Sequence, residues 1–176
     1  MVITPIVNDG RINRSKTTLN KIVAATISLL RKNNNGQIPT AQEIAVKSGV
    51  GIRTVFRHID DMEGLIEEVN RRYLNDLESY IAKNNPKQNS KDQRIEHVIK
   101  ERFYLYNTYQ HVFNLTITSL NNSSAIRTGF IKFNHILRQR FEDLIPEIKM
   151  INKDKQNLID CLLYTSDAAD ELLCVD

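Results

Sequence analysis

Residues 40–61, TAQEIAVKSGVGIRTVFRHIDD, contain the signals for two short helices separated by a tight turn. Thr40 followed by Glu43 at the third position is the pattern of a capping box, in which each side chain bonds the backbone N–H of the other residue. Gly49 interrupts the helical spacing of the apolar residues, and a second helical stretch runs on to about Ile59. This order predicts a helix-turn-helix, a motif whose second helix enters the major groove of DNA.

The second helix of this segment carries its positive charges on one side. At about 100° per residue, Val55 and Ile59 fall on one face, while Arg53 and Arg57 fall together on the other. Two like charges four residues apart cost an isolated helix about 0.2–0.5 kcal/mol. A phosphate backbone lying along the face would reverse that cost. We therefore expect an outward face formed by Arg53, Thr54 and Arg57 and flanked by Phe56 and His58.

Charge is distributed unevenly along the 176 residues. Residues 1–60 hold nine Lys/Arg against three Asp/Glu, an excess of six positive charges, whereas the other 116 residues hold 15 against 18. A basic first third on a near-neutral remainder is typical of a small nucleic-acid-binding domain attached to a body that does not bind nucleic acid. The alternative is a solvated basic surface. With no leader-like or membrane-spanning apolar run in the sequence, we expect a soluble, cytoplasmic protein.

Apolar residues recur with a helical period almost everywhere, and no segment alternates with period two, so the sequence predicts an all-α fold. We expect a basic arm with Arg11, Arg14 and Lys16, then a first helix over residues 18–32. Asp60 or Asp61 should cap a long helix that reaches residue 81. After a polar loop at residues 84–93, the predicted helices of the body cover residues 94–109, 112–121 and 125–145, stop at Pro146, and resume from residue 154.

From residue 17 to about residue 80 the order of elements resembles the TetR family of bacterial transcriptional regulators. The specific part is residues 40–66, TAQEIAVKSGVGIRTVFRHIDDMEGLI, which is similar to that family's pattern of T, I-A, G-V, T-hydrophobic-aromatic, H, D and E-x-L. The resemblance implies a homodimer that binds double-stranded DNA at a palindromic operator. It also implies a repressor that leaves its operator when a small-molecule inducer enters the helical body.

The resemblance assigns roles to individual residues. Thr40 corresponds to a phosphate-contacting helix cap, and the positions of the recognition helix that meet bases or phosphates are Arg53, Thr54, Arg57 and His58. Three positions depart from the pattern: Gly51 replaces a common Ser cap, Phe56 replaces Tyr, and Met62 replaces a phosphate-binding Lys. Phosphate contacts by Arg57 and by the arm residues Arg11, Arg14 and Lys16 would compensate for the lost donors. The predicted DNA-binding residues are therefore Arg14, Lys16, Thr40, Gly51, Arg53, Thr54, Phe56, Arg57 and His58.

Eight of the twelve aromatic residues lie between positions 103 and 141. A body of this size needs aromatic side chains to fill its core, so a stripe at helical spacing is consistent with packing alone. The resemblance favours a ligand-lined cavity, to which His97, His111 and the nearby tyrosines would supply polar groups. The predicted ligand-binding residues are His97, Tyr104, Tyr106, Tyr109, Phe113, Phe130 and Phe133.

Three classes of function were weighed against this sequence. An enzyme is not expected, because the chain has no Gly-rich phosphate loop, no nucleophile motif and no His or carboxylate pair at metal spacing, and no cofactor is predicted. A ligand-controlled DNA-binding regulator fits the resemblance. The alternative is a helix-turn-helix scaffold whose body binds a protein partner instead of a small ligand.

The end of the chain forms a separate segment. Residues 161–171, CLLYTSDAADE, resemble the translation of a sequencing adapter, so we expect the natural sequence to stop near Asp160. The predicted organisation is an arm and DNA-binding domain over residues 1–60, an incomplete regulatory and dimerisation domain over residues 61–160, and a non-native tail over residues 161–176. By resemblance, dimerisation would use the last two long helices, the first of which starts at residues 154–160. Both cysteines, Cys161 and Cys174, lie in the tail.

Overall fold

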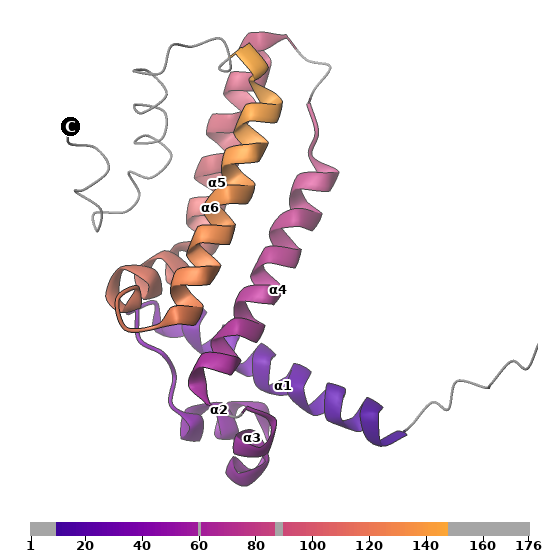
Figure 1. The fold of residues 1–176 in the computed structure, drawn as a ribbon, viewed down its shortest axis with the longest axis vertical. Helices are drawn as coiled ribbons and strands as arrows, with labels where there is room; N and C mark the ends of the chain where they lie inside the picture. The colour runs from indigo at the N-terminus through magenta and orange to yellow at the C-terminus, as the bar shows by residue number, and fades with distance from the viewer. Residues whose placement is uncertain (1–9, 60, 87–89, 148–176) are drawn as a thin grey trace, which may run out of the picture.

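The computed structural model describes residues 10–59, 61–86 and 90–147, and these residues form six α-helices and no strand (Figure 1). The predicted all-α class is therefore confirmed. The predictions that fall on residues 148–176, namely a further helix from residue 154 and a non-native tail, lie outside the described residues. The helices are α1 (Gly10–Asn33), α2 (Ala41–Ser48), α3 (Ile52–His58), α4 (Met62–Lys83), α5 (Lys91–Ser119) and α6 (Ser124–Leu144).

Helix α1 begins at Gly10, eight residues before its predicted start, so the prediction of a basic arm is wrong for residues 10–17. The hydroxyls of Thr17 and Thr18 donate to the carbonyls four residues earlier, at 2.8 and 2.9 Å. These polar side chains are thus satisfied inside a helix, where the sequence suggested a boundary. The side chain of Arg11 lies outside the described part of the structure.

The predicted caps of the next helices are confirmed. The Thr40 hydroxyl accepts a hydrogen bond from the Glu43 N–H at 3.3 Å, and the Glu43 carboxylate accepts one from the Thr40 N–H at 2.8 Å. Helix α2 ends at Gly49, whose φ of 67° is in the left-handed region that glycine enters without strain. Of the two possible caps of α4, Asp61 is shown to act, because its carboxylate accepts from the Gly64 N–H at 2.8 Å.

The sequence predicted two helices, at residues 94–109 and 112–121, and α5 consists of two helical segments joined at a kink. The kink lies at Tyr109, where φ is −110° and ψ is 16°, and the helical bonds then resume. The predicted break is therefore confirmed as the position of the kink. Helix α6 ends at Leu144, because the residue before Pro146 is disfavoured in the helical conformation.

Helices α4, α5 and α6 stand beside one another, and α1, α2 and α3 gather at one end of them (Figure 1). One apolar core joins the two groups and includes fully buried Ile22, Ile44, Val55 and Leu65. Helices α4 and α6 are held close together at Gly129, where an added Cβ would lie 2.4 Å from the side chain of Asn70. None of the described helices is both long enough and apolar enough to cross a bilayer.

A buried ion pair connects α4, α5 and α6 away from α1, α2 and α3. The guanidinium of Arg140 in α6 lies 3.3 and 3.4 Å from the carboxylate oxygens of Glu101 in α5, and both side chains are almost fully buried. Arg140 also donates to the carbonyl of Asn84, the residue that ends α4. Removing one member of such a pair is strongly destabilising, because the other charge is left buried without its partner.

Candidate nucleic-acid interface

Helix α3 has one buried and one exposed face. Val55 and Ile59 are buried in the shared core, and Arg53 and Arg57 are exposed, as their spacing predicted. The N-terminus of α3 follows Gly51, which has no side chain to bond the first N–H groups. An added Cβ at Gly51 would meet nothing within 4 Å, so the surface in front of this helix end is open.

The remaining residues of α3 complete this surface. Phe56, at the edge of the arginine face, exposes 58% of its surface, which is a large fraction for an aromatic ring. Thr54 and His58 are half-buried at the edges. The exposed side of α3 thus combines two guanidinium groups, an aromatic ring and a hydroxyl, the groups that bond guanine edges, contact thymine methyls and bond either base or phosphate.

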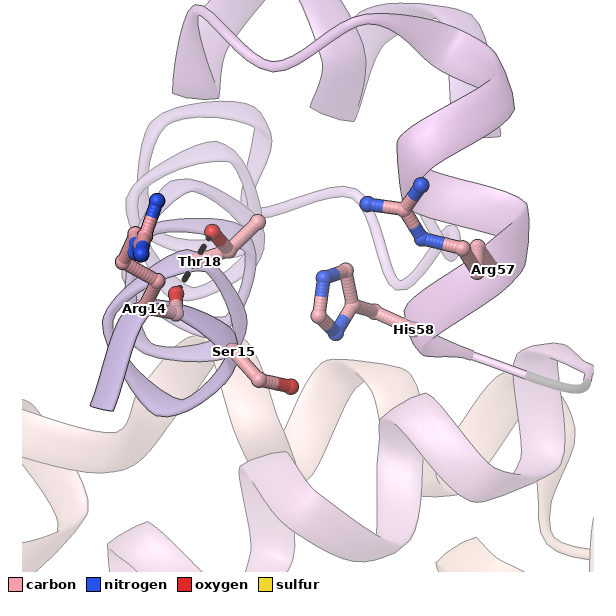
Figure 2. Close-up of a pocket in the computed structure, with 5 residues that line it drawn as sticks. All are labelled: Arg14, Ser15, Thr18, Arg57 and His58. Atoms are coloured by element: carbon pink, nitrogen blue, oxygen red, sulfur yellow. Dashed lines mark hydrogen bonds between the residues drawn. The ribbon is translucent and has the colours of Figure 1, made fainter. Parts of the chain in front are cut away.

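A groove of about 550 Å³ separates the last turn of α3 from the first turns of α1 (Figure 2). Arg14, Ser15 and Thr18 line it from α1, and Arg57 and His58 line it from α3. In Figure 2 the guanidinium of Arg57 extends toward α1, and His58 lies between the two helices. No carboxylate is among these five lining residues, so the groove combines two guanidinium charges with the Ser15 hydroxyl and the His58 imidazole, while the Thr18 hydroxyl donates to the Arg14 carbonyl. This donor set is suited to an anion with several acceptor oxygens.

The structure brings together some of the predicted DNA-binding residues and separates others. Arg14, Arg57 and His58 share the groove, whereas Lys16 is exposed on α1 at about 200° around the helix from Arg14 and does not line it. Ser15 and Thr18 were missed by the sequence analysis. These hydroxyl residues stand one and four positions after Arg14, and this spacing places them near Arg14 only if residues 14–18 are helical. The sequence analysis started the helix at residue 18, whereas α1 begins at Gly10.

Thr40 is exposed at the start of α2, but its hydroxyl is engaged within the chain. It accepts from the Glu43 N–H and donates to the Glu43 carboxylate at 2.8 Å. The backbone N–H of Thr40, followed by its hydroxyl, lowers the pKa of Glu43. A phosphate at Thr40 would therefore have to compete with the ionised carboxylate of Glu43 for the hydrogen bond that the Thr40 hydroxyl donates.

Four of the seven predicted ligand-binding residues line one small apolar cavity of about 40 Å³ between α4, α5 and α6: Tyr109, Phe113, Phe130 and Phe133. The phenylalanine rings of Phe113 and Phe133 meet edge to face, with centroids 5.7 Å apart. The cavity also touches Asn70, Tyr73 and Thr116, which the sequence analysis did not select. Their polar groups sit on otherwise apolar helix faces, a signal that does not distinguish a cavity from ordinary packing.

The other three predicted ligand-binding residues lie away from this cavity. Tyr104 stacks on Tyr80, with ring centroids 4.9 Å apart, and Tyr106 stacks on the outer side of Phe113 at 5.7 Å. His97 lies 3.3 Å from Glu101, beside the buried ion pair. These three side chains therefore take part in packing and ion pairing, and the structure does not bring them to the cavity.

His111 forms a buried hydrogen bond to Tyr73, with 2.7 Å between the hydroxyl oxygen and Nε2. Burial, helped by the nearby charge of Arg31, lowers the pKa of His111 to about 4. Burial also raises the pKa of Tyr73. Both groups are therefore uncharged at neutral pH, and the pair provides a polar but neutral contact behind the cavity.

Two sets of hydrogen bonds tie the parts of the fold together, one between α4 and α6 and the other between the loop after α1 and α5. The carboxylate of Glu63, in the first turn of α4, accepts from the Ser124 hydroxyl and the Ala125 N–H of α6, each at 2.9 Å. The pKa of Glu63 is lowered, chiefly by the hydroxyl of Ser123 and then by the Ala125 N–H. A negative charge at the start of α6 also interacts favourably with the helix dipole.

The second connection uses the loop after α1. Asn114 of α5 donates to the carbonyl and side-chain oxygens of Asn34, at 3.1 and 3.0 Å, and Thr118 donates to the Gly36 carbonyl. Gly36 has a φ of 70°, and an added Cβ would lie 2.6 Å from the Asn114 carbonyl oxygen. Only glycine fits both this backbone conformation and this close approach.

No protein-family profile matches the chain, and neither a curated protein nor a solved structure is similar to it. Within the described residues no group of three or more His, Cys, Asp or Glu side chains is arranged to hold a metal ion.

Proposed function

We propose that the chain is a DNA-binding transcriptional regulator in which α2, the turn at Gly49 and α3 act as a helix-turn-helix. The observation that carries the proposal is the exposed arginine face of α3 beside the groove that α1 and α3 share. Phosphate contacts supply affinity and register, and contacts to base edges supply specificity. In this arrangement α3 presents one arginine for each task.

The two arginines of α3 have different surroundings. Arg57 lines the groove together with Arg14 and His58, where several donors face one open groove, so we assign it to a backbone phosphate. Arg53 does not line the groove and lies nearer the start of the helix, which is the part of a recognition helix that meets base edges. A bidentate contact from Arg53 to guanine would contribute about 1–3 kcal/mol of discrimination.

The resemblance of residues 40–66 to TetR-family regulators extends this proposal to a homodimer on a palindromic operator. Two-fold symmetry of the protein then requires half-sites whose centres are about 34–36 Å apart, or a multiple of that distance. Release by a small-molecule inducer is supported by the aromatic cavity between α4, α5 and α6. The regulator would act as a repressor if the occupied cavity disfavours the DNA-bound arrangement.

A second candidate function is a DNA-binding scaffold whose body holds a protein partner. The observation that favours it is the outer side of α5, where Ile99, Phe103 and Ile117 are exposed at helical spacing. Large exposed apolar groups in one stripe are a feature of interaction surfaces. A partner on this stripe and a ligand in the cavity would both contact α5.

Selection of bound duplexes from a random-sequence pool tests the proposal. The expected result is an enriched palindrome. Arg53→Ala should weaken the enriched site by about 1–3 kcal/mol and have little effect on unrelated duplexes. Arg14→Ala should weaken both kinds of DNA alike. A pool without enrichment, or equal losses for Arg53→Ala on both kinds of DNA, would remove the support for sequence-specific recognition by α3.

A further inference from the structure

Two neighbouring hollows lie along α4 and α6, and they share part of their walls. One is an open, polar groove of about 520 Å³ between α4 and α6, and the other is the aromatic cavity of about 40 Å³ between α4, α5 and α6. Asn70, Leu74 and Gly129 line both of them. The groove and the cavity therefore have a common wall, and together they offer a polar part and an apolar part.

We propose that this joint site, the α4–α6 site, binds a short-chain amphiphile whose branched apolar end enters the cavity and whose neutral or cationic head remains in the groove. The proposal deepens the ligand-controlled function proposed above, and only the part that concerns release from DNA rests on that function. Separate observations support the three parts of this proposal. They concern the head group of the ligand, the size of its apolar end, and the connection between the α4–α6 site and the DNA-binding helices.

The lining and the volume of the cavity determine which apolar end a ligand can place there. Aromatic and aliphatic side chains form most of its wall, and no charged residue lines it. A charged group placed there would lose its hydration without gaining an opposite charge, which is strongly unfavourable. A volume of 40 Å³ corresponds to roughly three waters, since one water needs about 10–15 Å³ on this scale. A branched group of about three or four carbon atoms occupies a similar space.

The charges that line the groove determine which head group it favours. Its charged lining residues are Glu67, Glu68, Glu78, Arg71 and Lys132. Arg71 is already paired with Glu68, with 2.8 Å between Nε and a carboxylate oxygen. This pairing leaves two carboxylates against one ammonium group, so the mouth favours an amine or an uncharged hydroxyl over a carboxylate.

Asn70 and Gly129 form the boundary between the two parts. Asn70 Nδ2 donates to the Ala125 carbonyl at 2.8 Å, which holds the amide against α6. The space for this amide exists because residue 129 is glycine, since a Cβ there would lie 2.4 Å from Nδ2. Gly129→Ala should therefore displace the Asn70 side chain within the boundary and obstruct passage from groove to cavity.

A ligand in this position would act on the two helices that Glu63 connects. Glu63 joins the first turn of α4 to the first turn of α6, and α4 begins three residues after Ile59 of the DNA-binding helices. A molecule inserted between α4 and α6 changes their separation if it binds the two arrangements unequally. The orientation of α3 would then change with it.

Three probes with the same branched alkyl end test the head preference: 3-methylbutylamine, 3-methylbutanol and 3-methylbutanoate, titrated into the full chain without DNA and followed by the NMR signals of the aromatic rings. We expect shifts at Phe130 and Phe133 and affinities in the order amine, alcohol, carboxylate. Gly129→Ala should weaken the amine at least about tenfold, a loss of about 1.4 kcal/mol. A carboxylate that binds best, or ring signals that move with none of the probes, would overturn the proposal.

A surface variant keeps the test valid if Gly129→Ala fails to fold. Glu78→Lys changes an exposed residue of the groove and should lower the affinity for the amine while raising that for the carboxylate. The matched control is Glu96→Lys, an exposed residue of α5 that does not line either hollow. Equal effects of the two charge changes would overturn the assignment of the head. Probe binding that leaves DNA affinity unchanged would refute the regulatory link and leave the site itself supported.

Discussion

Replacing Arg57 by Ala should reduce the affinity of the chain for DNA of any sequence and make that affinity less sensitive to salt. The surface we assign to DNA exposes three arginines, of which Arg14 and Arg57 are assigned to phosphates and Arg53 to a base edge. Each phosphate neutralised by a cation releases counterions and contributes about −0.9 to the slope of log K against log salt concentration, so two contacts give about −1.8 for each protomer. Without Arg57 the slope should be about −0.9.

The same relation gives the loss in affinity. At about 0.1 M salt, one decade below a reference of about 1 M, a slope contribution of 0.9 corresponds to roughly an eightfold weaker complex, or about 1.2 kcal/mol. The measurement is fluorescence anisotropy of a short labelled duplex of mixed sequence, titrated with protein at several salt concentrations between about 50 and 200 mM.

The control for this experiment is Lys100→Ala, which removes an equally charged side chain from α5. Lys100 is 73% exposed, is paired with Glu96 and lies outside the α1–α3 groove. Its replacement should leave the slope unchanged. An unchanged slope for Arg57→Ala, or the same reduction for Lys100→Ala, would refute the assignment of Arg57 to a phosphate, because net charge alone would then explain the binding.

Three further predictions concern stability and coupling. Gly36→Ala should lower the stability measured by urea unfolding more than Gly49→Ala does. Both glycines have left-handed φ, which costs alanine about 1–2 kcal/mol, but only at Gly36 would the new Cβ meet a backbone carbonyl. Equal losses of stability would contradict the close approach at Gly36. Burial holds the pKa of His111 at about 4, against 6.5 in the unfolded chain, so the unfolded chain takes up the proton first as pH falls. Between pH 7 and pH 5 the free energy of unfolding of the wild type should therefore fall by about 2 kcal/mol more than that of His111→Gln. Identical pH profiles of the two proteins would contradict this. Glu63→Gln should speed amide hydrogen exchange at Ala125 while urea stability falls by less than about 1 kcal/mol, and unchanged exchange would argue against the connection.

The elements that the sequence predicted correctly are those fixed by neighbours along the chain. The Thr40–Glu43 capping box, the left-handed end of α2 at Gly49 and the Asp61 cap all involve residues within four positions of one another. The buried face of α3 follows in the same way from the spacing of Val55 and Ile59. Interactions of this range are present in the residue pattern itself.

The prediction that was wrong concerns a helix boundary in polar sequence. No breaker separates Gly10 from residue 18, yet the first apolar stripe begins only there, and the expected start followed the stripe. Tertiary contacts extend helices where local preference is weak. In α5, by contrast, the break that the sequence predicted near Tyr109 coincides with the kink between the two helical segments.

The sequence by itself determined that this protein is helical, where its short helices begin and end, and that α3 carries arginines on the side opposite its apolar residues. Only the tertiary structure decided that Arg14 and Arg57 share a groove, that four of seven candidate aromatic and histidine residues reach the cavity, and that Glu101 and Arg140 pair in the interior. The physical reason is range. Caps and helix faces depend on residues a few positions apart, whereas the groove and the ion pair join residues about 40 positions apart, whose meeting depends on how the helices pack into one core.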